Sequence, residues 1–148
     1  MNFTPSNPDF ATVVQASFAR QGLMQMMGAK LDRVEPGAVD ISMPYSESLT
    51  QQHGFMHAAA ITAIADTASG YAALSLMPAG SEVLTIELKV NLLRPAAGTH
   101  FVAEGRVIKP GKTITVSRAD VFARADDGVP TLVATLTATM IMQAGKNN

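Results

Sequence analysis

The sequence predicts an α+β fold, in which a curved antiparallel sheet of five to six strands wraps around one long central helix. The first observation is an apolar stretch at about residues 57–77, rich in Ala, Ile and Leu and apolar nearly all round, as in a buried helix. The second is a set of alternating strand patterns on both sides of that stretch. The third is the short turns between the later strands, which imply antiparallel pairing and a sheet packed against the helix.

Before the long helix, the sequence predicts a short helix and then a β-hairpin. The short helix is expected at about residues 8–21, where apolar side chains recur at helical spacing. The hairpin strands are expected at 27–34 and 38–44, joined by a Glu-Pro-Gly turn. Residues 45–52 are polar and are expected to form a loop.

After the long helix, four more strands are expected. They are separated by turns that contain Gly, Pro and Asp, and they lie at about residues 83–93, 101–109, 113–124 and 131–142. A loose tail is expected at 144–148. The chain shows no repeat, linker or low-complexity segment, so all 148 residues are expected to form a single domain.

Composition and charge argue against several classes of protein. A net charge of −1 gives no reason to expect a nucleic-acid partner or an acidic membrane surface. There is no cysteine, and the three histidines lack clustered carboxylates, so no metal site is expected. The N-terminus does not resemble a secretory signal. The long apolar stretch contains Asp66, His57 and several hydroxyl groups, so it is poorly suited to span a membrane. A cytoplasmic protein without a metal or bound cofactor is expected.

Asp66 interrupts the apolar pattern of the long helix. It stands between Ala65 and Thr67, and Asp is both a poor helix former and costly to bury without a partner. One interpretation is a polar group satisfied by a neighbour or facing a subunit contact. The other is a carboxylate held in a cleft to carry out chemistry.

The stretch QQHGFMHAAAITAIADTASGYAA and the following TIELKVNLLRP resemble the hotdog-fold thioesterases, and most closely their phenylacetyl-CoA (PaaI-like) group. The likeness covers nearly the whole chain, from about residue 28 to residue 142. The motif of that family has a polar residue, a Gly and then His-Gly-Gly. Gln51, Gly54 and His57 match it here, whereas Ala58 and Ala59 replace the two glycines.

The resemblance implies hydrolysis of an acyl-CoA thioester without a metal or bound cofactor. Asp66 matches the family's catalytic acid, as nucleophile or general base, and Thr85 matches a Ser or Thr that helps to hold water. The backbone N–H of Ala58, at the helix start, is the expected oxyanion donor, with the N–H of Ala59 as a second candidate, and Gln51 can offer its amide. The residues assigned to substrate binding are His57, Gly54, Ala59, Asn91 and Arg94.

The spacing of Ala58 and Asp66 predicts a site shared between two protomers. Eight residues of helix span about 12 Å, whereas a reacting carbonyl needs both groups at about 3 Å. Ala58 and Gln51 are therefore expected from one protomer, and Asp66 and Thr85 from the other. Bare sheet edges also favour self-association, as a homodimer or a homotetramer.

Two other functions are weighed against the thioesterase hypothesis. Because two alanines replace the glycines of the motif, a non-catalytic acyl-CoA-binding module is one alternative. A hotdog dehydratase or hydratase is less favoured, because the segment Gly54-Phe55-Met56 lacks the proline that marks the loop of those enzymes. Aryl-acetyl, medium-chain and long-chain acyl groups are all compatible with the sequence. The thiol that carries the acyl group is either CoA or an acyl-carrier protein.

Overall fold

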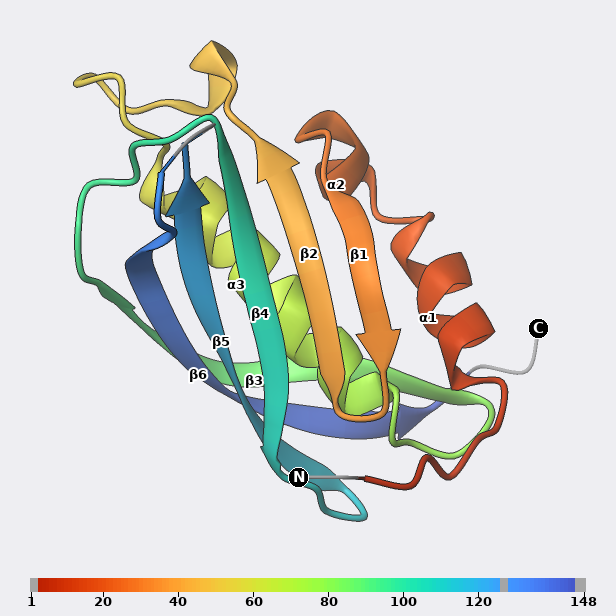
Figure 1. Cartoon of the computed structure of the whole chain (residues 1–148). Coiled ribbons are helices and arrows are strands. Elements are labelled where there is room, and N and C mark those ends of the chain that lie inside the picture. Colours follow the sequence, from red (N-terminus) through yellow and green to blue (C-terminus); the bar gives the residue numbers. More distant parts are fainter. Residues whose placement is uncertain (1–2, 126–127, 146–148) are drawn as a thin grey trace.

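One six-stranded antiparallel sheet curves around the long helix α3 (Ala58–Leu74), as Figure 1 shows. The structure is a computed structural model that describes residues 3–125 and 128–145. In spatial order the strands are β1 (Lys30–Glu35), β2 (Ala38–Pro44), β4 (His100–Lys109), β5 (Ile114–Arg124), β6 (Thr131–Ala144) and β3 (Ser81–Leu92). The predicted α+β class and the strand number are confirmed.

The N-terminal region holds two short helices where one was expected. Helix α1 (Phe10–Phe18) begins two residues later than predicted, and α2 (Gly22–Met26) follows after an extended Gln21. The strand expected from residue 27 therefore begins at Lys30 instead. The reason is packing: Met24 and Met27 are three residues apart, at helical spacing, and both are buried.

Helix α3 ends three residues before the predicted end. Its last turn is closed by Ser75, whose hydroxyl donates to the Ala72 carbonyl (2.7 Å) and accepts from the Gly37 N–H (2.7 Å). This second bond ties the helix end to the β1–β2 turn. Among the described residues no helix is long and apolar enough to cross a membrane.

Small residues let the helix lie directly on the sheet. Ala65, Ala68 and Ala72 are fully buried, and the helix packs on β2, β4 and β5. Gly105 on β4 lies against the helix backbone, and a Cβ at this position would collide with the Ala68 carbonyl. This close contact fixes the height of α3, and with it Asp66, above the sheet.

The loose tail predicted at 144–148 is wrong for its first two residues. Ala144 belongs to β6, and the Gly145 N–H donates to the Gly80 carbonyl at 2.7 Å. Residues 146–148 lie outside the described part of the chain. A short 3₁₀ turn, η1 (Glu47–Leu49), lies within the expected loop before α3.

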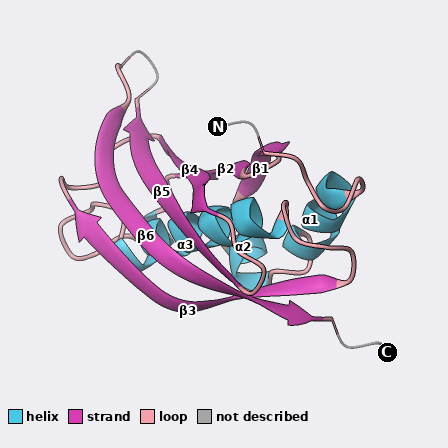
Figure 2. Cartoon of the chain, turned by 90° about the horizontal axis from the view of Figure 1, so that it is seen from below, coloured by secondary structure: helices cyan, strands magenta, loops and turns pink. Residues whose placement is uncertain are grey.

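Strand β3 is a sheet edge with a β-bulge. It is 12 residues long, and among the described strands it pairs with β6 alone, at the rim of the sheet seen in Figure 2. Thr85 pairs with Met140 and Glu87 with Thr139, so Ile86 is an extra residue on β3. The bulge reverses the alternation of side chains. It turns Thr85 to the inner face of the sheet, the face that carries the buried Met140 and packs on α3.

Candidate active site

Asp66 and Thr85 meet between α3 and β3. The Thr85 hydroxyl donates to a carboxylate oxygen of Asp66 at 2.7 Å, and it also contacts the Met140 sulfur at 3.3 Å. A hydroxyl has one proton, so donation to the carboxylate leaves only a lone-pair contact with the sulfur. Both residues line a cavity of about 440 Å³ beside the exposed face of α3.

The surroundings of Asp66 make its carboxylate more basic than usual. Burial raises the pKa of the Asp66 carboxyl, and the Thr85 hydroxyl, which donates to the ionised form, lowers this pKa by less. None of the residues that line the cavity is a Lys, an Arg or a His, so no nearby cation offsets the burial. The result is a half-buried, unneutralised carboxylate that faces open space, which is what a general base or nucleophile requires.

The start of α3 offers one free N–H group rather than two. His57 is the N-cap of the helix, and its Nδ1 accepts from the Ala59 N–H at 2.9 Å. Ala59 is therefore not available to bind an oxyanion. Within residues 3–125 and 128–145, the Ala58 N–H has no acceptor. It lies at the positive end of the helix dipole, where an anion is stabilised.

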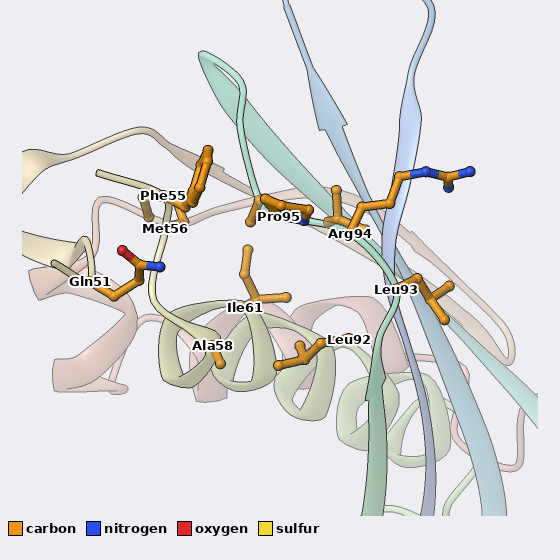
Figure 3. A pocket seen from close by; sticks show the side chains of 11 residues that line it. Gln51, Phe55, Met56, Ala58, Ile61, Leu92, Leu93, Arg94 and Pro95 are labelled. Atoms are coloured by element: carbon orange, nitrogen blue, oxygen red, sulfur yellow. The ribbon is translucent and has the colours of Figure 1, made fainter. Parts of the chain in front are cut away.

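A tight loop before the helix holds Gln51 beside Ala58. The Gln51 N–H donates to the Phe55 carbonyl (2.9 Å), and Gly54 turns the chain with a φ of 80°, a conformation that suits glycine. The side-chain oxygen of Gln51 accepts from the His53 N–H. Its amide NH₂ is thus left to donate, and Figure 3 shows the nitrogen turned toward the cavity.

Gln51 and Ala58 line a second cavity, of about 460 Å³. Most of its other lining residues are apolar: Phe55, Met56, Ile61, Leu92, Leu93, Pro95, Ala96 and Val133. Arg94 also lines it, but its guanidinium donates to the Leu132 carbonyl (3.1 Å) and points away from the cavity in Figure 3. Asn91, expected to bind substrate, lines neither cavity. It pairs with Thr135 on the outer face of the sheet.

The predicted site residues thus fall into two groups within one chain. Asp66 and Thr85 line one cavity, whereas Gln51 and Ala58 line the other. Eight residues of continuous helix separate Ala58 from Asp66, about 12 Å at 1.5 Å per residue. No thioester carbonyl can contact both groups of the same chain at once.

A polar network at the end of the Asp66 cavity was not predicted. The Gln21 amide donates to the Tyr71 hydroxyl (2.9 Å), which donates to the Ser17 hydroxyl (3.1 Å). Tyr71 lies four residues after Thr67, which also lines the cavity, so helical spacing could have placed it on this face. Gln21 is far away in the sequence and gave no signal. In the part of the chain that the structure describes, no group of three His, Cys, Asp or Glu residues could hold a metal ion.

Sequence comparison places these features in a known context. A profile of the thioesterase superfamily matches residues 53–129, which include Asp66, Ala58 and Thr85. A protein of Halobacterium salinarum, provisionally named an esterase, is 33% identical over 85% of this chain and 87% of its own length. A protein of Saccharolobus solfataricus with the same provisional name is 33% identical over 70% of this chain and 73% of its own length.

Solved structures agree with the hotdog arrangement. A thioesterase family protein of Silicibacter pomeroyi superposes with a TM-score of 0.89 and 47% identity, covering 92% of this chain and 99% of that one. The PaaI protein of Escherichia coli superposes with a TM-score of 0.80, covering 95% of this chain and 98% of its own. Its identity of 17% supports the fold alone. The predicted hotdog fold is confirmed.

Proposed function

The chain belongs to the thioesterase superfamily, and from that membership we propose that it hydrolyses an acyl-CoA thioester to a carboxylic acid and free CoA. The observation that carries the proposal is the Asp66–Thr85 hydrogen bond inside a cavity. A carboxylate with a raised pKa, oriented by a hydroxyl and facing open space, is suited to attack a carbonyl or to activate water. The relatives' names, thioesterase family protein and provisional esterase, support the same reaction class.

The free N–H of Ala58 supplies the second part of the chemistry. When a nucleophile adds to a thioester carbonyl, negative charge develops on the oxygen, and a fixed donor lowers that barrier. The Ala58 N–H is such a donor, and the Gln51 amide lies beside the same cavity. The N–H belongs to the backbone, so the Ala that replaces the family's Gly keeps it.

The site is completed by a second copy of the chain, which brings Ala58 of one protomer to Asp66 of the other. The edge strand β3 supports this pairing, because it has unused backbone groups and large apolar side chains exposed to solvent: Leu84, Ile86, Leu88 and Leu92. Thr85 lies on the same strand, so pairing along β3 places its neighbours at the subunit contact. The protein is therefore a homo-oligomer built from shared-site dimers.

The reaction balances with water as the only co-substrate. With Asp66 as general base, its carboxylate takes a proton from water while the water oxygen bonds to the thioester carbon. The tetrahedral oxyanion then collapses, the C–S bond breaks, and the proton passes to the leaving thiolate. With Asp66 as nucleophile, its carboxylate adds to the thioester carbon, the C–S bond breaks to give an acyl anhydride and the CoA thiolate, and water then opens the anhydride. A single turnover in isotopically labelled water tests the second route, because water that opens the anhydride at the Asp66 carbonyl carbon leaves its label in the Asp66 carboxylate, and general-base catalysis never does so.

The test of the function is thiol release from a panel of aromatic and straight-chain acyl-CoAs. Wild type is expected to turn over at least one of them, and Asp66→Asn, which keeps the shape and removes the charge, is expected to abolish turnover. The matched control is Asp32→Asn, a carboxylate on β1 that accepts from Ser42 and lines neither cavity. Equal activity of wild type and Asp66→Asn would refute the role of Asp66. Binding of acyl-CoA without turnover would favour the non-catalytic module.

A further inference from the structure

An apolar hollow continues from the Asp66 cavity along α3. It has a volume of about 360 Å³ and lies between α2, the η1 turn and the first half of α3. Leu23 and Ala63 line both this hollow and the Asp66 cavity, so the two spaces adjoin at these residues. Ala59, Ala63 and Asp66 follow at i, i+4 and i+7, which places them along one face of the helix.

We propose that this hollow, lined by Leu23, Met26, Met27, Leu49, Ala60 and Ala63, binds the acyl chain of the thioester, with Leu23 and Ala63 forming its entrance. The assignment rests on the proposed function, since the carbonyl must lie at Asp66. It specifies two features that the proposed function leaves open: where the acyl group binds and how long this group is.

The lining of the hollow selects an apolar ligand. No residue that lines it is an Asp, Glu, Lys or Arg. Its polar lining residues are Ser48, Thr50 and His57, and each of them is already hydrogen-bonded within the chain. Leu23 and Met26 are 50% and 69% exposed, and an apolar ligand would cover them. Met side chains adapt to the ligand's shape, which suits a flexible chain.

The other cavity is less suited to the acyl chain. Beside its apolar walls it holds two donors that are free among the described residues, the Gln51 amide and the Ala58 N–H. Coenzyme A carries phosphates and amides that need such groups or solvent. The division of polarity therefore assigns the CoA side to the cavity with Gln51 and Ala58, and the acyl side to the hollow beside α2.

The distance along α3 from Asp66 to Ala59, a residue that lines the hollow, indicates a straight acyl group of medium length. Asp66 and Ala59 are seven residues apart, about 10 Å along the helix axis. At roughly 1.3 Å of advance per C–C bond, an extended chain of about eight carbons spans that distance. Chains of about eight to ten carbons are the expected substrate class, in preference to short acyl groups that leave the hollow empty.

The test is the chain-length profile of kcat/KM, from butyryl-CoA to palmitoyl-CoA. Leu23→Trp narrows the entrance from α2, and Ala63→Leu narrows it from α3. Both variants are expected to lower kcat/KM for octanoyl-CoA about tenfold or more, and to change butyryl-CoA only about twofold. The matched control is Leu93→Trp in the other cavity, where any loss is expected to be the same for all chain lengths.

Several outcomes would overturn the assignment. A chain-length-dependent loss in Leu93→Trp would place the acyl chain in the other cavity. Uniform losses in both entrance variants would show that the hollow does not select chain length. A change of oligomeric state in Leu23→Trp, measured by light scattering, would mark Leu23 and Met26 as a subunit contact. Calorimetric titration with decanoyl-CoA and with CoA separates this question from catalysis. If no acyl-CoA is hydrolysed, tighter binding of decanoyl-CoA that Leu23→Trp weakens would still support the hollow, and equal binding of the two would refute it.

Discussion

Replacing Ala58 by proline removes one hydrogen-bond donor and little else. Ala58 is the first residue of α3, and its N–H has no acceptor in the described part of the chain. Proline is favoured at the first helical position, because its missing N–H is not needed there. The residue before a proline must be extended, and His57 already has φ −62° and ψ 141°. Ala58→Pro should therefore fold normally.

The expected effect of Ala58→Pro is confined to the reaction rate. Loss of one oxyanion donor costs about 10² to 10³ in kcat, equivalent to about 3–4 kcal/mol of transition-state stabilisation. The assay is thiol release at saturating acyl-CoA, with thermal unfolding measured in parallel. Ala58→Gly is the matched control, because it keeps the N–H and costs the helix about 1 kcal/mol or less.

The same variant tests whether the site is shared between protomers. Ala58→Pro and Asp66→Asn each disable both sites of a homodimer, but a mixed dimer has one site with both groups intact. Random reassortment makes about half of the dimers mixed, each with one of its two sites active, so activity should recover to about a quarter of wild type. The two variants are to be unfolded together in urea and refolded.

Two results would refute this reasoning. An Ala58→Pro variant with wild-type kcat and an unchanged melting temperature would show that the Ala58 N–H does not stabilise the transition state. Failure of the co-refolded mixture to exceed the activity of either variant, although mixed dimers are present by mass spectrometry, would place both groups in one protomer.

Contacts of the site and of the core give three more expected outcomes. Thr85→Val removes the donor that lowers the pKa of Asp66, so the acid limb of the kcat–pH profile should move to higher pH; an unmoved limb would argue against that hydrogen bond. Asp66→Asn should unfold at higher urea concentration than wild type at pH 7. The pKa of Asp66 is higher in the folded chain than in the unfolded chain, so ionisation of Asp66 lowers the free energy of unfolding of wild type as the pH rises through the folded pKa. Below the unfolded pKa this loss is absent, so the difference in stability between wild type and Asp66→Asn should shrink toward pH 3. Gly105→Ala drives a Cβ into the Ala68 carbonyl and should lower the free energy of unfolding by about 1–3 kcal/mol; circular dichroism during urea denaturation would measure it, and wild-type stability would contradict the close packing of α3 on β4.

Sequence patterns alone predicted the layers of the fold and the residue types of the site. Period-two patterns identified β2 and β6 closely, because each has one face in the core and one toward solvent. The unbroken Ala-rich run identified α3. Asp66 was singled out in it because burying a lone carboxylate in an apolar helix is energetically costly. The eight-residue spacing from Ala58 also indicated that the two cannot serve one carbonyl within a chain.

Which polar groups are free and which are hydrogen-bonded depends on the tertiary structure. Local patterns could not show that His57 takes the Ala59 N–H and leaves that of Ala58 unbonded, since both lie in the same helical turn. Nor could they place Asn91 on the outer face, or show that the Arg94 guanidinium is held by Leu132. These outcomes depend on strand register and on side-chain partners distant in sequence.

Thr85 is the clearest example of a residue whose chemical type is known from the sequence but whose position depends on the tertiary structure. Strict alternation along β3 would point this side chain away from α3, because Leu88, three residues later, pairs with the buried Ala138. The bulge at Ile86 adds one residue to β3 and turns Thr85 inward, 2.7 Å from Asp66. A bulge arises from how two strands pair across more than fifty residues of sequence, so β3 alone carries no pattern that specifies it. Residue types in sequence thus supply the carboxylate and the hydroxyl, and only the pairing of β3 with β6 brings them into contact.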